Sequence, residues 1–154
     1  MSERADVLAV DLGAESGRGI IGAFDGQRLA LREVRRFPNI PVRLPAEGGA
    51  ASHLHWDILR LWHEVQETIA AAARDSRAGL TSVGVDTWGV DFALLDRSGA
   101  LLGNPYHYRD DRTDGLLAEA FRRVPREAIF EQTGIQFLQF NTLFQLLSMV
   151  LTQP

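Results

Sequence analysis

Short apolar runs separated by turn signals make up the first forty residues of the chain. Residues 5–11 and 18–24 are rich in Val, Ile, Leu and Ala, as buried strands are. Asp25-Gly26 follows, a dipeptide that favours a tight hairpin turn. Residues 27–37 have partly alternating apolar positions, which is typical of a strand with one solvent-facing side. The pattern predicts three strands that form an antiparallel meander over residues 5–37.

A helical pattern comes after a segment that is rich in proline and glycine. Residues 38–52 contain three prolines and the run Glu47-Gly48-Gly49-Ala50, so they are predicted to form a loop. Asp57 is then well placed as a helix N-cap. Apolar residues recur at helical spacing from residue 58 onwards and predict an amphipathic helix that continues to about Arg77. Gly79 is expected to end it.

The second half of the chain mixes both patterns. Residues 81–87 and 92–96 are predicted to be strands, and the pattern is helical from Asp110 onwards. Pro125 is expected as a first helical residue and Gly134 as a helix stop, with Asn141 or Thr142 capping the last helix. Three strands, a helix, a strand and further helices indicate an α/β domain. Its antiparallel opening differs from the strict βαβ alternation of doubly wound nucleotide-binding folds.

Composition and charge exclude several kinds of function. With 154 residues, 45% of them hydrophobic, the chain is expected to form one domain with one core. A net charge of −4 argues against nucleic acid or an anionic membrane as a partner. The chain has no Cys and no Lys, which excludes disulfides, thiolate metal sites, a P-loop lysine and a Schiff-base lysine. The charged N-terminus and the lack of a long apolar run predict a soluble, cytoplasmic protein.

The glycine-rich segment Asp11-Leu12-Gly13-Ala14-Glu15-Ser16-Gly17-Arg18 joins one predicted strand to the next. P-loop and dinucleotide-binding glycines open a helix instead. Here the backbone N–H groups and Arg18 are expected to face a polyphosphate, as amides do in anion-binding nests. Asp11 would supply the carboxylate that Mg²⁺ on this phosphate needs. The alternative is an ordinary hairpin turn in which Asp11 only caps the strand end.

A second group of polar residues follows the strand predicted over 81–87. Asp86, Thr87, Trp88, Gly89 and Asp91 combine carboxylates, a flat apolar side chain and a glycine that lets a ligand approach the backbone, which suits a sugar. A core tryptophan and a turn-capping acid are the alternative.

Two further groups of residues have less specific patterns. Arg109, Asp110 and Arg112 either form a solvated cluster at a helix start or order the sugar pocket. His53 and His55 lie two residues apart and would share a strand face. A metal site at these histidines is not favoured, because no carboxylate or Cys lies beside them in the sequence.

Three segments resemble a known family. Val85–Asp96 is similar to the signature segment of the rhamnulokinases, a group within the FGGY carbohydrate kinases. Tyr106–Thr113 resembles their Tyr-Arg-Asp-x-Arg-Thr box, and Gly134–Leu143 the segment that follows it. The resemblance covers residues 5–154. It implies the actin-like ATPase (ribonuclease H-like) fold, an α/β fold whose mixed sheet opens with an antiparallel three-stranded meander and is flanked by helices.

The resemblance also implies a reaction and a set of contacts. The reaction is ATP-dependent phosphorylation of L-rhamnulose to L-rhamnulose 1-phosphate in L-rhamnose breakdown. In the family the first loop contacts ATP and the glycine of the Trp-Gly pair contacts the sugar. Glu15 departs from the wider sugar-kinase pattern and is expected to point outward or toward metal-bound water. The ATP-contacting positions here are Ala14, Glu15, Ser16, Gly17 and Arg18, and the sugar-binding candidates are Gly89, Asp86, Trp88 and Asp110.

The same resemblance predicts that residues 1–154 are the N-terminal kinase domain, on the sugar and phosphate side of the cleft. The family's general base is an Asp that would lie beyond Pro154, so no catalytic residue is expected here and the chain alone should be inactive. Two alternatives stay open. One is a kinase for another ketose or polyol (ribulose, xylulose, fuculose or glycerol), and the other is a non-catalytic module that binds sugar or a partner protein. The sequence does not indicate an oligomeric state.

Overall fold

The computed structural model describes residues 5–46 and 51–152. The chain divides into two compact units. Unit 1 comprises Met1–Ile40 and Asp57–Gly89, and unit 2 comprises Pro41–Trp56 and Val90–Pro154.

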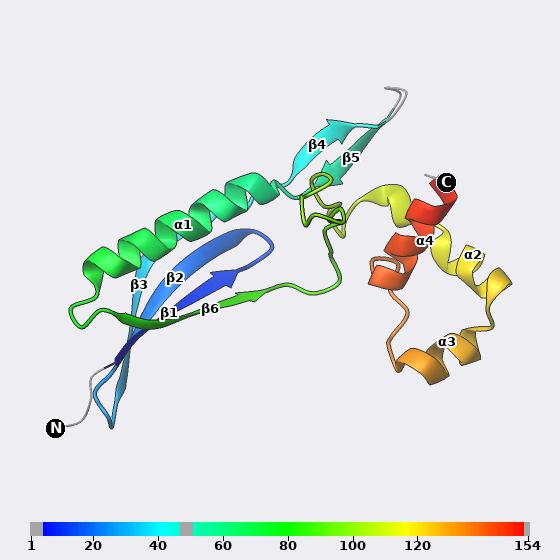
Figure 1. Ribbon diagram of the computed structural model, residues 1–154. Helices are drawn as coiled ribbons and strands as arrows, with labels where there is room; N and C mark the ends of the chain where they lie inside the picture. The colour runs from blue at the N-terminus through cyan, green and yellow to red at the C-terminus, as the bar shows by residue number, and fades with distance from the viewer. Residues whose placement is uncertain (1–4, 47–50, 153–154) are drawn as a thin grey trace. The chain divides into compact units, whose positions relative to one another are not determined.

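Unit 1 is built on a four-stranded sheet with the strand order β3-β2-β1-β6 (Figure 1). Its strands are β1 (Ala5–Leu12), β2 (Ser16–Phe24), β3 (Leu29–Pro38) and β6 (Leu80–Thr87). β1 pairs antiparallel with β2, and β2 pairs antiparallel with β3, which confirms the predicted meander. β6 runs parallel to β1, so the sheet is mixed.

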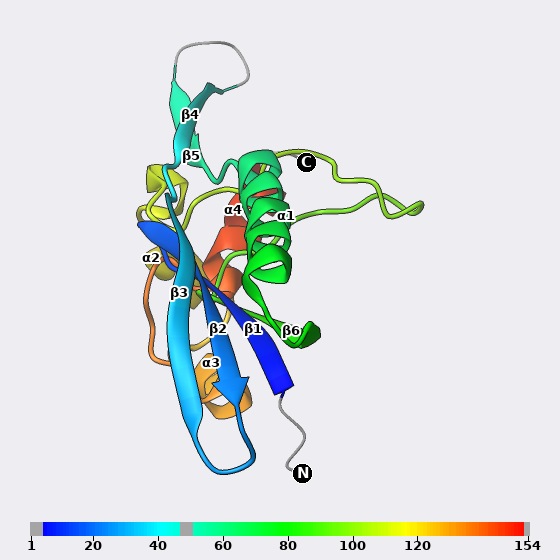
Figure 2. The ribbon, with the colours of Figure 1, turned by 90° about the vertical axis from the view of Figure 1, so that its left-hand side faces the viewer.

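The helix α1 (Ile58–Asp75) lies along this sheet (Figures 1 and 2). The core between them consists of apolar side chains that alternate along the strands and recur at helical spacing along α1. Asp57 caps the helix as predicted, because its carboxylate accepts a hydrogen bond from the Arg60 backbone N–H at 3.2 Å. α1 ends at Asp75, slightly earlier than predicted, and its C-cap is Ser76, so the prediction that Gly79 ends the helix is wrong. Gly79 instead adopts a positive φ of 81° in the turn that leads to β6. The buried core residues are Leu8, Val10, Ile21, Val65 and Ala72.

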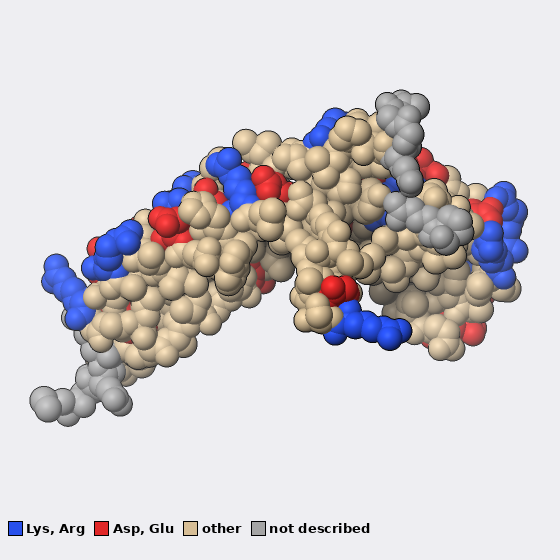
Figure 3. Space-filling view, turned by 45° about the horizontal axis from the view of Figure 1, so that its top comes forward, with Lys and Arg blue, Asp and Glu red and all other residues tan. Residues whose placement is uncertain are grey.

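Charged side chains of both signs mix on the surface of unit 1 (Figure 3). Arg32 pairs with Asp75, and Arg35 pairs with Glu64 at 2.6 Å. These pairs join β3 to α1.

Unit 2 begins with a hairpin that the sequence analysis did not predict. β4 (Val42–Pro45) pairs antiparallel with β5 (Ser52–His55), so the prediction of a loop over 38–52 is wrong for these residues, and β3 itself extends to Pro38. Pro45 is the last residue of β4, and the two strands form a sheet of their own. A proline is tolerated in such an edge strand because its missing N–H leaves no buried partner unpaired.

The predicted strand over 92–96 is also wrong. The structure has an isolated bridge between Leu95 and Leu101, closed by a turn around Asp96. The Asp96 carboxylate accepts hydrogen bonds from the Ser98 hydroxyl and from the Ser98 and Ala100 N–H groups. These bonds lower the pKa of Asp96, the Ser98 hydroxyl having the largest effect. Hydrogen bonds to the Asp96 side chain therefore take the place of the strand pairing that the apolar run 92–96 suggested.

From Asp111 onwards the regular structure of unit 2 is helical, as predicted. It contains the short 3₁₀ helix η1 (Asp111–Thr113), α2 (Leu116–Arg123), α3 (Arg126–Thr133) and α4 (Thr142–Thr152). Pro125 is the N-cap of α3 and not its first residue, whereas Gly134 ends that helix with a φ of 63°, as expected. In the described part of the chain, no helix combines the length and the apolar character needed to cross a membrane.

Candidate functional site

Two acidic residues lie next to each other at one edge of the unit 1 sheet. Asp11 of β1 and Asp86 of β6 are partners in the parallel register, one residue before each strand ends. The glycine-rich loop leaves β1 at this edge, and Trp88 and Gly89 leave β6 there. Ligands of sheets with parallel strands bind outside the carboxyl ends of these strands. Unit 1 therefore brings Asp11, the loop and the Trp-Gly pair to the same edge.

Hydrogen bonds fix the shape of the loop between β1 and β2. The Gly13 N–H donates to the Ser16 carbonyl at 3.0 Å. Asn39, which is buried, donates from its backbone N–H to the Glu15 carbonyl at 3.0 Å and from Nδ2 to the Gly13 carbonyl at 2.9 Å. The carbonyl groups of Gly13, Glu15 and Ser16 are thus bonded within the protein, which leaves them unavailable to oppose an anion. Nothing in the sequence links Asn39 to the loop, so this residue was not predicted.

The loop glycines have a structural reason of their own. A Cβ on Gly13 would lie 2.8 Å from the Ser16 carbonyl oxygen. A Cβ on Gly17 would overlap the Phe37 ring, which is buried on β3. The fold itself therefore demands these two glycines, whether or not a ligand approaches the loop.

Arg18 and Asp11 bind each other. The Arg18 Nε and a terminal guanidinium nitrogen both lie 2.7 Å from Asp11 Oδ2. Both side chains are partly exposed, at 44% and 37%. A phosphate at Arg18 or a metal ion at Asp11 would compete with this pair, so the pair has to open for either to bind there. Glu15 is exposed, as expected if it points outward.

The charges continue across the sheet on β3. Arg36 is the register partner of Arg18, and its guanidinium forms two hydrogen bonds to the Glu33 carboxylate at 2.6 and 3.1 Å. This bonding lowers the pKa of Glu33, with a smaller contribution from the charge of Arg18. The pKa of Arg36 is raised mainly by Glu33, and Asp11 adds to the rise. The sheet edge therefore has acidic Asp86 and Asp11 beside basic Arg18 and Arg36.

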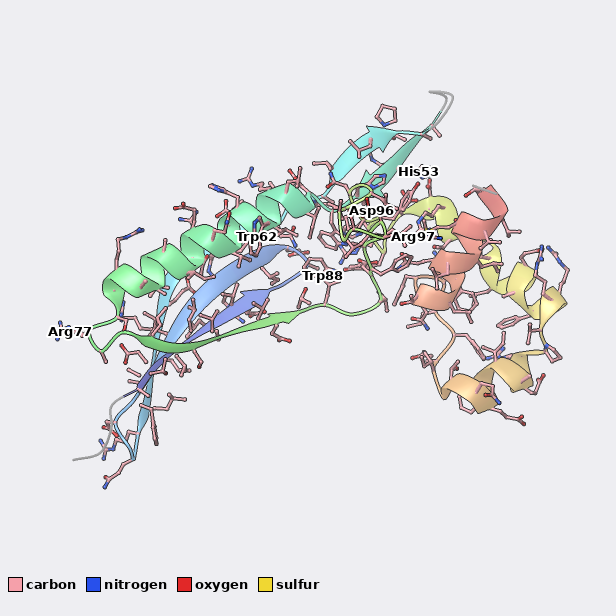
Figure 4. All side chains as sticks on the ribbon, viewed as in Figure 1. His53, Trp62, Arg77, Trp88, Asp96 and Arg97 are labelled. Carbon is pink, nitrogen blue, oxygen red and sulfur yellow. The ribbon has the colours of Figure 1, made fainter. Side chains whose placement is uncertain are left out.

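Trp88 and Gly89 follow directly after β6 (Figure 4). Trp88 is half-buried and Gly89 is exposed. A Cβ built on Gly89 would meet no atom of the described part of unit 1 within 4 Å. In unit 1, a side chain at this position would therefore occupy open space and not the core.

Asp110, the remaining sugar-binding candidate, is buried in unit 2, where its carboxylate organises the chain around it. Oδ2 accepts the Leu54 N–H at 2.6 Å, and Oδ1 accepts the Arg112 N–H at 3.1 Å and lies 3.0 Å from Nδ1 of His53. Asp110 also precedes η1 as its N-cap. The carboxylate thus ties the β5 strand to η1.

His53 has carboxylates near it that the sequence did not suggest. His53, Asp110 and Asp111 each offer one ligand atom, and these atoms lie within 4.8 Å of one another. The Asp110 oxygens already accept hydrogen bonds from backbone N–H groups, which makes them less available to bind a cation. His55 does not join this group. Its Nδ1 lies 2.9 Å from the Asn104 carbonyl.

A polar network in unit 2 surrounds Gln145 of α4. Arg112 donates to the Gln145 carbonyl at 2.9 Å and to its Oε1 at 2.6 Å, and its guanidinium lies 4.1 Å from the centre of the Tyr106 ring. Burial lowers the pKa of Arg112. Asp91 accepts from Gln145 Nε2 at 2.8 Å and from the Trp56 indole N–H at 2.6 Å. Asp91 and Arg112 were predicted from the sequence as polar residues of interest. Gln145 and Trp56 were not, because nothing in the local sequence pattern distinguishes them.

Next to this network lies a cavity of about 690 Å³. Its lining combines apolar side chains with histidines, a tyrosine and Arg112, and every lining residue belongs to unit 2. His107 lies nearby, buried against the Trp56 ring at 4.0 Å between ring centres. Burial lowers the pKa of His107, and its Nδ1 accepts the Arg109 N–H at 2.9 Å, which favours the neutral ring.

Comparisons with known proteins identify the family to which the chain belongs. Residues 7–151 match the N-terminal domain of the FGGY family of carbohydrate kinases. The chain is 43% identical over 143 residues to a rhamnulokinase from Bacteroides thetaiotaomicron, covering 93% of the chain and 28% of that protein. It is 43% identical over 145 residues to a rhamnulokinase from Pectobacterium atrosepticum, covering 92% of the chain and 27% of that protein. The chain thus spans less than a third of the length of these relatives.

Solved structures show the fold. A gluconate kinase from Lactobacillus acidophilus aligns over 98% of the chain and 29% of its own length, with a TM-score of 0.79 at 15% identity. A Plasmodium falciparum glycerol kinase with ADP aligns over 98% of the chain and 29% of its own length, with a TM-score of 0.69 at 18% identity. The predicted fold class is confirmed, since these kinases share the actin-like ATPase fold and the sheet is mixed. The resemblance of the three sequence segments is confirmed as well.

Proposed function

Because this chain belongs to the FGGY family of carbohydrate kinases, we propose that its full-length protein phosphorylates L-rhamnulose with ATP. The product is L-rhamnulose 1-phosphate, formed at the primary hydroxyl of the ketose during L-rhamnose breakdown. The similarity to two proteins named rhamnulokinase supports this substrate. The cytoplasm, where ATP is plentiful, is the compartment that fits the proposal.

One observation carries the proposal furthest. The parallel pairing of β1 and β6 brings the glycine-rich loop and the Trp88-Gly89 pair to the same edge of one sheet. Transfer of a phosphoryl group requires the phosphate donor and the acceptor hydroxyl to be held close together and in line. A sheet edge with a phosphate loop on one strand and a sugar segment on the next strand supports such an arrangement.

On the nucleotide side, residues Ala14 to Arg18 contact ATP in this proposal. The inward bonding of the loop carbonyls to Asn39 and Gly13 leaves a backbone with the polarity that a phosphate prefers. Arg18 exchanges Asp11 for a phosphate oxygen when the nucleotide binds. Since exposed ion pairs contribute little to stability, this exchange costs little.

Asp11 is the candidate ligand for Mg²⁺ in this proposal. Its carboxylate suits a hard cation that keeps several waters and binds through one or two carboxylates together with the substrate phosphates. The ion would offset the charge of the transferring phosphate. Asp11 is partly exposed at the edge of the sheet, so its oxygens are accessible once the pair with Arg18 opens.

On the sugar side, Asp86, Trp88 and Gly89 are the proposed contacts. Asp86 offers hydrogen bonds to hydroxyls, Trp88 offers a flat apolar face and Gly89 allows close approach to the backbone. Asp110 contributes by ordering β5 and η1. We also propose that residues 1–154 form the sugar and phosphate side of the cleft, and that the rest of the protein supplies the adenosine side and the general base.

The first test is a coupled ADP-release assay on the full-length protein. L-rhamnulose should be phosphorylated faster than L-ribulose, D-xylulose, L-fuculose or glycerol at equal concentration. A clear preference for one of the other acceptors would show that the proposed substrate is wrong but the kinase reaction is right. The absence of ADP release with every acceptor would overturn the kinase assignment. The chain of 154 residues alone should show no turnover near the roughly 1–100 s⁻¹ that is typical of kinases.

Two substitutions in the full-length protein separate the two sides of the site. Asp11→Asn should lower kcat by about 10²–10³, the usual effect of losing a group that stabilises transition-state charge, and leave sugar affinity nearly unchanged. Gly89→Val should raise the KM for L-rhamnulose while ATP binding persists. The open space around Gly89 in unit 1 makes it a clean probe. If Asp11→Asn mainly weakened sugar binding and Gly89→Val left it intact, the nucleotide and sugar sides of the site would be assigned the wrong way round.

A further inference from the structure

Val90, the residue that follows Gly89, has an unusual backbone conformation. Its φ of 68° makes it the one non-glycine residue with a positive φ in the described part of the chain. The left-handed region is particularly unfavourable for a β-branched side chain, and such residues persist only where the surrounding structure holds them. The groups that hold Val90 therefore also determine the path of the backbone next to the proposed sugar contact.

These groups come from one helix. The Thr142 hydroxyl, at the first residue of α4, donates to the Val90 carbonyl at 2.6 Å. Gln145 lies one helical turn further on and is 1% exposed. Its Nε2 donates to the Asp91 carboxylate at 2.8 Å and to the Phe140 carbonyl at 2.9 Å, with the Val90 carbonyl at 3.4 Å. Residues of α4 thus hold the Val90–Asp91 turn both at the Val90 carbonyl and at the Asp91 carboxylate.

The chemistry of its neighbours fixes the orientation of the Gln145 amide. On one side, Arg112 donates to Oε1 at 2.6 Å, and a guanidinium can only donate. On the other side, Nε2 faces the Asp91 carboxylate and two carbonyls, which can only accept. Glutamate has the right shape but no donor, and lysine or arginine has no acceptor. Only an amide of this length satisfies both sides.

We propose that Gln145 is a positioning residue that holds the Val90–Asp91 turn and thereby sets the affinity of the site for its sugar. It does not touch the substrate. It acts through the backbone that joins Val90 to Gly89, and this inference rests on the proposed function of the Trp88-Gly89 pair as a sugar contact. The nucleotide loop belongs to β1 and β2 and is not part of this network, so the effect should be confined to the sugar.

The test is a double-mutant cycle in the full-length protein. Gln145→Glu places a carboxylate against the Asp91 carboxylate, and Asp91→Asn places an amide donor against the Gln145 donor. Each single variant should raise the KM for L-rhamnulose roughly 10- to 100-fold, the order expected when a reacting group is displaced by about 1 Å. The KM for ATP should stay within about twofold. In the double variant the amide introduced at position 91 can donate to the carboxylate introduced at position 145 and accept from Trp56, so most of the loss should be recovered.

Control variants separate positioning from general damage. Gln132→Glu makes the same substitution on an exposed face of α3 and should change neither KM. Thr142→Val removes one hydrogen bond to the Val90 carbonyl with little change in shape, and should raise the sugar KM by less than Gln145→Glu does. It is the informative variant if Gln145→Glu fails to fold. An unchanged sugar KM in both α4 variants, or an equal rise in the KM for ATP, would overturn the proposal.

A second measurement does not depend on the reaction. The indole N–H of Trp56 donates to Asp91, so its resonance in an ¹⁵N-labelled sample reports on the turn. It should shift in Gln145→Glu and return toward the wild-type position in the double variant. If the wild-type protein phosphorylates no sugar, the proposed function fails while this spectrum still tests the hold on the turn. An indole resonance that is unmoved by Gln145→Glu would overturn the positioning role.

Discussion

The two units of this chain are stabilised in different ways. Unit 1 buries a cluster of apolar side chains between a sheet and a helix, with Leu8, Val10 and Ile21 each no more than 2% exposed. Unit 2 has short helices and a small hairpin, and much of what it buries is polar, including Asp110 and Gln145. Apolar burial tolerates small shifts, whereas a buried polar network requires every donor to meet an acceptor. Unit 1 is thus held mainly by apolar packing, whereas unit 2 relies more on hydrogen bonds between buried polar groups.

The largest effect should come from the core of unit 1. Leu8→Ala removes a buried side chain and should lower the free energy of unfolding by about 2–5 kcal/mol. Leu59→Ala makes the same change on α1, where the side chain is 69% exposed, and should cost no more than about 0.5 kcal/mol. Urea unfolding followed by circular dichroism measures both. Equal losses in the two variants would contradict the assignment of Leu8 to the core.

The next largest effect tests the polar character of unit 2. Trp56→Phe keeps an aromatic ring against His107 but removes the indole donor to Asp91, so it should cost about 1.5–3 kcal/mol, the range for a hydrogen bond to a charged group. Trp62→Phe is the matched control, since Trp62 is 60% exposed on α1. The comparison uses unfolding curves of the two variants. If Trp56→Phe were as mild as the control, hydrogen bonding would not be what stabilises unit 2.

A smaller effect is expected at the loop. Gly17→Ala forces a Cβ against the Phe37 ring and should cost about 1–3 kcal/mol, as overpacking does. Gly84→Ala on β6 meets no atom within 4 Å in unit 1 and should be nearly neutral. Adding Phe37→Leu to Gly17→Ala should recover part of the loss, because the smaller side chain makes room. No recovery in the double variant would mean that Gly17 is needed for another reason.

The smallest effect is the pH dependence from His107. Burial lowers its pKa below the ordinary value of 6.5, so the unfolded chain binds the proton more readily than the folded chain does. The stability that depends on neutral His107 is therefore fully present above about pH 6.5. It falls as the pH drops from there through the lowered pKa. His107→Asn keeps an acceptor for the Arg109 N–H and should flatten the profile between about pH 7 and 5. Thermal unfolding at a series of pH values measures how stability changes with pH. If His107→Asn left this pH dependence unchanged, groups other than His107 would be its cause.

The part of the site on unit 1 was largely predictable from the sequence. Its strands follow apolar runs, and the Asp11 loop and the Trp88-Gly89 segment were both placed at strand ends, where the structure has them. Two features were not predictable. Asn39 lies more than twenty residues from the loop that it holds, and the pairing of Arg18 with Asp11 depends on a cross-strand register that a sequence does not state.

In unit 2 the errors have a common cause. The apolar run 92–96 suggested a strand, but Asp96 satisfies its neighbours' N–H groups in a turn. The prolines of 38–52 suggested a loop, but the strand β4 forms there with Pro45 at its end. Local sequence rules fail at these positions because hydrogen-bond partners compete with regular pairing, and the winner depends on the surroundings.

The sequence by itself determined the antiparallel meander, the amphipathic helix, the family and the two segments of chemical interest, because hydrophobic periodicity and ordered motifs are local properties. Only the tertiary structure decided that Asp11 and Asp86 are neighbours, that a Cβ at Gly17 would overlap Phe37, and that Gln145 donates to Asp91 beside the left-handed Val90. Each of these depends on residues that are distant in the chain. Their contacts follow from strand register and helix packing, and these are properties of the folded chain as a whole.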